Sequence, residues 1–144
     1  MAMNSDIERI RGQLEALSAM DALRMTLPHL RRAEVCQGDN AANWSVQFAM
    51  DWLQKSDEER RLLALEEADK LKYEGVAGLI YAAVGWSRGS MVDPKVSDLK
   101  APEDLSSKAT AGAMLTALAG ESDDARKQAL VAALMADLTH VAPT

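Results

Sequence analysis

The run from Val76 to Trp86 constrains the fold of this chain more than any other segment, because it is apolar on every side. A helix without a polar face has to be covered by its neighbours all round. The run is also too short to cross a bilayer, which needs about 20 apolar residues. We therefore expect it to be the buried central helix of a soluble domain.

Helical periodicity recurs on both sides of this run. Apolar residues at helical spacing predict an opening helix through Leu14 and a closing helix through Leu138. No segment alternates apolar and polar residues for long enough to indicate a strand. Hydrophobic residues make up 48% of the chain and aromatic residues only 4%, so the core depends on strong helix formers such as Ala and Leu. The prediction is an all-α, single-domain bundle over residues 1–144, with about six or seven helices and a long Pro-containing loop at about 88–103.

Prolines and capping residues mark the expected helix ends. Pro28 is expected to stop one short helix and to begin the next, which covers residues 29–36. Ser56 is followed three residues later by Glu59, which is the pattern of a capping box. Ser122 is the expected cap of the last helix.

Charge and cysteine content exclude several classes of partner. The net charge is −6, which disfavours nucleic acid and anionic membrane surfaces as partners. The basic pairs Arg31-Arg32 and Arg60-Arg61 stand beside acidic residues, so we interpret them as solvated helix faces. The single cysteine, Cys36, rules out an internal disulfide and fits a core position. Because the N-terminus also has no apolar signal segment, we expect a cytoplasmic protein.

The stretch Gly85-Trp86-Ser87-Arg88-Gly89 fits G-x-S-x-G, the nucleophile elbow of serine hydrolases. That elbow needs a strand before the serine and a helix after it, whereas here a helical segment precedes Ser87 and prolines follow it. A hydrolase that uses Ser87 is therefore a distant alternative. The favoured interpretation is a structural turn, in which Trp86 closes the helix, Gly89 takes a left-handed conformation, and Ser87 and Ser90 bond free carbonyls.

Other signs of chemistry are absent from the sequence. His29, Cys36 and His140 lack zinc-site spacing, and no phosphate-binding loop is present, so we expect neither a metal nor a cofactor. Trp44, Phe48 and Trp52 lie four residues apart and form one helical stripe. With this net charge the stripe is either core or a surface for a partner helix, rather than a platform for stacking bases. The sequence does not decide between core and interface.

The segment 88–103 is the expected binding element. Long loops in compact domains are usually functional or disordered, and apolar residues such as Met91 argue against full disorder here. Arg88 and Lys95 add positive charge to an otherwise acidic protein. The hypothesis is that Arg88, Met91 and Lys95 lie at the interface with another protein, whereas a purely structural loop is the equal alternative. The sequence leaves the oligomeric state open.

Several short motifs resemble a family of small uncharacterised bacterial proteins, some of them encoded near type VI secretion genes. The motifs occur in a fixed order and are Leu27-Pro28, Arg31-Arg32, Trp44, Trp52, Glu59-Arg60-Arg61, Ala82-Ala83-Val84, Trp86-Ser87-x-Gly89-Ser90 and Ala109-x-Ala111-Gly112-Ala113. The resemblance covers roughly residues 27–138 and implies an accessory protein of a Gram-negative bacterium. It leads us to expect a non-enzymatic adaptor or accessory factor that binds another protein and is linked to type VI secretion. The alternative is an immunity protein that neutralises a toxin.

Overall fold

The computed structural model describes residues 2–88, 102 and 104–140. In these residues the chain forms eight helices and no strands, so the predicted all-α bundle is confirmed and the helix count is slightly higher than expected. The helices are α1 (Ala2–Glu15), α2 (Ala19–Arg32), α3 (Glu34–Gly38), α4 (Asn40–Gln54), α5 (Glu58–Lys70), α6 (Gly75–Gly85), α7 (Leu105–Ala119) and α8 (Asp124–Thr139).

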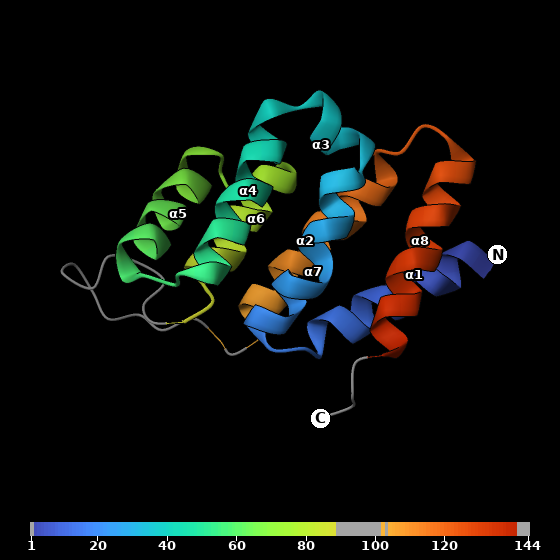
Figure 1. The fold of residues 1–144 in the computed structure, drawn as a ribbon, viewed down its shortest axis with the longest axis horizontal. Coiled ribbons are helices and arrows are strands. Elements are labelled where there is room, and N and C mark those ends of the chain that lie inside the picture. Colours follow the sequence, from blue (N-terminus) through green and yellow to red (C-terminus); the bar gives the residue numbers. More distant parts are fainter. Residues whose placement is uncertain (1, 89–101, 103, 141–144) are drawn as a thin grey trace.

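The two middle helices of the bundle are α6 and α7, which pack against each other (Figure 1). Helices α4 and α5 cover α6, whereas α1 and α2 cover α7. Helix α8 packs mainly on α1 and α2 at the opposite end of the molecule from α5 (Figure 1). The apolar run that is expected to be central does form α6, and residues such as Ile80, Ala83 and Val84 are fully buried. No helix of the described residues has the length and hydrophobicity that crossing a bilayer requires.

Glycines allow α5 and the turn that follows it to approach α6 closely. A Cβ atom added at Gly85 would lie 2.5 Å from Leu65 Cδ2, and one added at Gly78 would lie 2.9 Å from the backbone of Tyr73. Both glycines are buried and lie two turns apart on α6. The close packing of α5 and its following turn against α6 therefore depends on glycine, which has no Cβ atom, as well as on contacts between apolar side chains.

Pro28 lies inside α2 rather than between two helices, so the expected break at this position is wrong. A proline removes one backbone donor, which here leaves the Arg24 carbonyl without its usual helical partner. Pro28 is exposed, whereas the opposite face of α2 buries Leu23, Leu27 and Leu30. We attribute the survival of the helix to this tertiary burial, which offsets the loss of a single hydrogen bond.

Two predicted helix caps are shifted by one residue. Asp57 caps α5 by accepting from the Arg60 backbone N–H, whereas Ser56 donates its hydroxyl to the Trp52 carbonyl instead. Similarly, Asp123 rather than Ser122 caps α8. In both cases a carboxylate follows the serine, and its negative charge also interacts favourably with the positive end of the helix dipole.

Candidate functional site

The tryptophan stripe of α4 runs from the core to the surface. Trp52 is fully buried, and its Nε1–H donates to the Asp57 carbonyl at 3.2 Å. Phe48, one turn earlier, is half-buried, and Trp44, one turn earlier again, is 67% exposed. The sequence leaves core and interface open as alternatives; the structure places Trp52 in the core and leaves Trp44 exposed, so an interface role for Trp44 stays a prediction.

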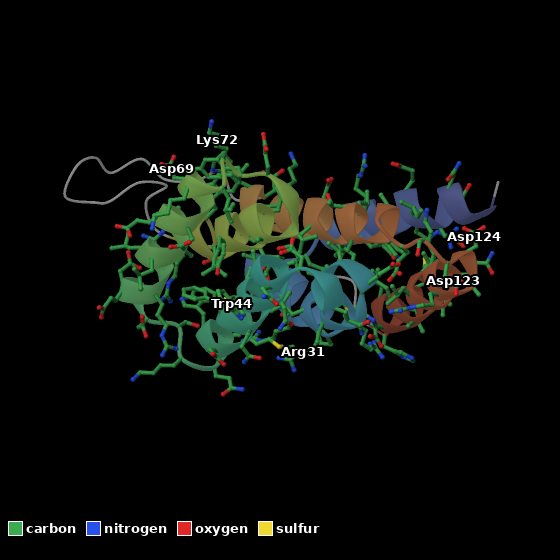
Figure 2. The ribbon with its side chains drawn as sticks, turned by 90° about the horizontal axis from the view of Figure 1, so that it is seen from above. Arg31, Trp44, Asp69, Lys72, Asp123 and Asp124 are labelled. Carbon is green, nitrogen blue, oxygen red and sulfur yellow. The ribbon has the colours of Figure 1, made fainter. Side chains whose placement is uncertain are left out.

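Phe48 packs against an aromatic residue of α6. The rings of Phe48 and Tyr81 meet edge to face, with their centroids 5.4 Å apart. Burial raises the pKa of Tyr81, and the nearby carboxylate of Glu67 on α5 raises it further. Tyr81 thus lies where α4, α5 and α6 come together. In Figure 2, Trp44 projects from α4 on the side of the bundle where α5 lies.

Leu63 adds an exposed apolar residue on α5. It is 46% exposed and lies one helical turn before Glu67. Leu63 therefore shares a helix face with the carboxylate that raises the pKa of Tyr81. We call Trp44, Phe48 and Tyr81 the aromatic surface. Its members come from α4 and α6, and only the spacing of Trp44 and Phe48 is visible in the sequence.

The turn after α6 is held by local hydrogen bonds. The backbone N–H of Trp86 donates to the Ala82 carbonyl at 2.8 Å, and the Ser87 hydroxyl donates to the Val84 carbonyl at 2.6 Å. Trp86 also stacks on Tyr73, with ring centroids 5.3 Å apart. The other two members of the predicted turn, Gly89 and Ser90, lie outside the described residues.

Arg88 is the one residue of the predicted partner site that the structure describes, since Met91 and Lys95 lie outside the described residues. Its guanidinium donates to the Ser56 carbonyl and lies 5.8 Å from the centroid of the Trp52 ring. Arg88 is therefore engaged with the turn between α4 and α5. The hypothesis that Arg88, Met91 and Lys95 contact a partner stays a prediction.

Beneath Arg88 lies a buried cation that sequence reasoning missed. The sequence predicts Arg61 to be part of a solvated helix face, but this prediction is wrong, because its side chain is completely buried. Its guanidinium donates to both carboxylate oxygens of Glu58, at 2.8 and 2.6 Å, and to the Gly85 carbonyl at 2.5 Å. These contacts connect the start of α5 to the end of α6.

Ser87 also lines a hollow of about 740 Å³ near the start of α2 and α7. The other lining residues are Glu15, Ala16, Leu17, Ser18, Ala19 and Asp104. Among these described residues there is no histidine that could act as a base for Ser87. The hydroxyl of Ser87 is itself bonded to the Val84 carbonyl, as the interpretation of a structural turn expects.

The three possible metal ligands of the sequence are dispersed. His29 is buried, its Nδ1 accepts from Arg32 at 2.9 Å, and its Nε2 therefore carries the proton and donates to Asp137 at 2.6 Å. His140 is exposed at the end of α8. Burial raises the pKa of the Cys36 thiol to about 11. Within the described part of the chain, no group of three or more potential ligands is placed to hold a metal ion.

A family model described as a family of unknown function, DUF6931, matches residues 16–138. The match includes residues 27–138, where the sequence motifs resemble a family of uncharacterised proteins. The expected membership of an uncharacterised family is therefore confirmed. No curated protein and no solved structure matches the chain.

Proposed function

We propose that this chain, which belongs to DUF6931, a family of unknown function, is a non-enzymatic module that binds another protein through its aromatic surface. The observation that carries the proposal is the position of Trp44, which is 67% exposed and lies one helical turn before Phe48, whose ring packs on Tyr81. Single exposed apolar residues are common on monomeric proteins. An exposed Trp on the same helix stripe as the half-buried Phe48 and the fully buried Trp52 is a more specific feature.

The physical chemistry of the aromatic surface suits binding. Trp and Tyr dominate the energetics of protein interfaces because they bury much area at a small cost in side-chain entropy. Phe48 is half-buried and its ring packs on Tyr81, so this neighbour of Trp44 on α4 is already ordered before a partner arrives. Such preorganisation reduces the entropy lost on association.

The biological setting that we propose is an adaptor or accessory role in the cytoplasm, linked to type VI secretion. An immunity protein that neutralises a toxin is the second candidate, because the net charge of −6 would attract a basic toxin. Both roles use the same kind of surface. They differ in the identity of the partner, so one experiment can separate them.

The experiment places p-benzoylphenylalanine, a photo-crosslinking amino acid that keeps a large aromatic side chain, at position 44 and expresses the variant in the native host. We expect irradiation to link the chain to a specific protein, which mass spectrometry then identifies. Components of the secretion apparatus would support an adaptor, whereas a toxin would support immunity. The matched control carries the crosslinker at Arg9, an exposed residue of α1, which packs on α7 and α8.

The absence of a crosslinked partner at position 44, or the same product from position 9, would overturn the proposal. Trp44→Ala provides a second test, because it should reduce recovery of the partner while leaving the melting temperature within a few degrees of the original. Truncation of a residue this exposed is expected to cost little stability.

A further inference from the structure

We propose that Glu34 and Glu121 hold one proton between them at neutral pH, so that the contact between α3 and the turn from α7 to α8 weakens as this proton is lost at alkaline pH. We call these two residues the carboxyl pair. The inference is independent of the proposed function, because none of the residues that it uses belongs to the aromatic surface. It follows from a closed ring of hydrogen bonds and from one buried oxygen that the ring leaves without a partner.

The ring of hydrogen bonds joins the start of α3 to the turn between α7 and α8, which lies beside it (Figure 1). The Glu34 backbone N–H donates to Glu121 Oε1 at 3.0 Å. In return, the backbone N–H and the hydroxyl of Ser122 donate to the Glu34 carboxylate at 2.9 and 3.0 Å. Because Ser122 directly follows Glu121, these bonds hold both carboxyl groups within one small ring.

Glu121 has one oxygen that this ring does not satisfy. The residue is only 7% exposed, and its Oε2 is buried without a hydrogen-bond partner among the described residues. No cation in the described part of the chain forms an ion pair with Glu121. An ionised carboxylate buried in this way loses hydration without compensation. A proton on Oε2 removes the charge and makes the oxygen a donor.

The acceptor for that proton is the carboxylate of Glu34. Hydrogen bonds from the backbone and the hydroxyl of Ser122 lower the pKa of Glu34, and a hydrogen bond with the Glu121 carboxyl lowers it further. Two carboxyl groups that share one site do not both ionise readily, so one of them retains a proton. Since the surroundings of Glu34 favour its charged form, the proton is placed mainly on Glu121.

The other charged groups near the carboxyl pair do not replace this proton. Arg126 on α8 is the cation that acts on Glu34, and its guanidinium donates to the Arg32 carbonyl at 2.9 Å. The Arg32 guanidinium is itself bonded to His29 within α2. The remaining titratable or charged side chains on the ends of α2 and α8, on α3 with its C-cap and on α7 are Arg31, Cys36, Asp39, Lys108, Asp123, Asp124 and Lys127.

The direction of the pH dependence follows from the number of protons bound. In the unfolded chain a glutamate titrates near its ordinary pKa, which is 4.5 for Glu34. A folded state that keeps a proton above this pH binds more protons than the unfolded state, so its stability falls as the pH rises. The lowered pKa of Glu34 has the opposite effect, and its contribution is lost only as the pH falls below 4.5. The proposed weakening therefore belongs to neutral and alkaline pH.

A direct test follows the carboxyl carbons by NMR in protein labelled with carbon-13 at glutamate Cδ. We expect the carboxyl pair to titrate in two steps, one below and one above the ordinary range for glutamate. Glu121→Gln should remove the upper step. Wild-type protein in which every glutamate is fully ionised at about pH 6 would overturn the proposal, and this outcome does not depend on the folding of any variant.

Thermal unfolding provides a second test. Glu121→Gln keeps the shape of a protonated carboxyl group but has no proton to lose. Between about pH 6 and pH 9, the melting temperature of the wild type should fall by at least about 3 °C relative to that of this variant. Glu66→Gln is the matched control, because Glu66 is exposed on α5 and forms no ion pair among the described residues, and it should follow the wild type. Parallel curves for the wild type and Glu121→Gln would contradict the shared proton.

Calcium separates a proton from a bound cation as the group that neutralises the carboxyl pair. Bound Ca²⁺ takes about six to eight oxygen ligands, and within the described residues no group of three or more potential ligands is placed to hold a metal ion. We therefore expect CaCl₂ to change the melting temperatures of the wild type and Glu121→Gln equally. Stabilisation of the wild type alone would show that a cation occupies the pair and would overturn the proposal. Crosslinking from position 44 decides the proposed function separately.

Discussion

Arg61 and Glu58 form a two-point ion pair in which the cation is fully buried and the carboxylate is half exposed. The guanidinium Nε and Nη2 lie 2.8 and 2.6 Å from the two oxygens of Glu58. A buried guanidinium that loses its carboxylate keeps the cost of desolvation without the compensating charge. The pair is therefore a point at which a small change should have a measurable effect on stability.

Glu58→Gln should lower the free energy of unfolding by about 1 to 2 kcal/mol at neutral pH, because it weakens charged hydrogen bonds at a half-exposed site. Hydrogen bonding to Arg61 lowers the pKa of Glu58 from its ordinary value of 4.5. The stabilisation is therefore present above pH 4.5 and is lost as the pH falls through the lowered pKa of the folded state. Urea unfolding should show the gap between wild type and variant closing at acid pH. Glu59→Gln, the neighbouring exposed control, should change stability by less than about 0.5 kcal/mol at either pH.

Cys36 should be nearly inert in the folded protein. Its side chain is 3% exposed, and burial together with the charge of Asp39 raises the thiol pKa to about 11. At pH 8 only about one thiol in a thousand would be ionised, and the thiolate is the reactive form. A disulfide reagent such as DTNB should release colour rapidly only after denaturant is added. Complete reaction of the native protein within seconds would contradict this environment for Cys36.

The hydrophobic pattern of the sequence was sufficient to predict those parts of the fold that depend on residues close together in the sequence. The all-round apolar run became the central helix because nothing in it could face water. The serine caps failed because Ser56 and Asp57 are both good caps, and the choice between them depends on the path of the backbone. Pro28 was misinterpreted because the burial that sustains α2 comes from other helices.

The candidate site could be predicted only in part, for the same reason. Trp44 and Trp52 occupy equivalent positions in the sequence stripe, yet one is exposed and the other is buried. The difference arises from the placement of α5 and α6, which the spacing within α4 does not encode. Arg61 likewise resembles a surface residue in sequence, and its burial depends on the Gly85 carbonyl on another helix.

Gly85→Ala should destabilise the protein by about 1 to 3 kcal/mol through overpacking. The added methyl group would lie 2.5 Å from Leu65 Cδ2 and 2.7 Å from Leu65 Cγ, and Leu65 is buried. Gly12→Ala is the matched control, because nothing lies within 4 Å of its Cβ position, and it should stabilise α1 by up to about 1 kcal/mol. Thermal unfolding measures both. If the clash is the cause, Leu65→Ala should cost less in the Gly85→Ala background than alone.

The turn between α5 and α6 offers a test of backbone strain. Lys72 and Tyr73 have φ angles of +56° and +58°, in the left-handed region that non-glycine residues rarely adopt. Tyr73 has a compensating contact, because its ring stacks on Trp86. The side chain of Lys72 is exposed and points away from the bundle (Figure 2), so its substitution changes mainly the backbone preference.

Lys72→Gly should therefore raise the free energy of unfolding by about 0.5 to 1 kcal/mol, since glycine adopts this conformation without a steric penalty. Part of the gain is offset by the greater freedom of glycine in the unfolded chain. Lys72→Ala is the control that removes the side chain but keeps the Cβ, and it should leave stability almost unchanged. Tyr73→Gly should instead destabilise the protein, because the lost stacking on Trp86 exceeds the relieved strain. Melting temperatures for the three variants give the order Lys72→Gly, Lys72→Ala, Tyr73→Gly from highest to lowest, and a Lys72→Gly value below that of Lys72→Ala would show that the turn is not strained at Lys72.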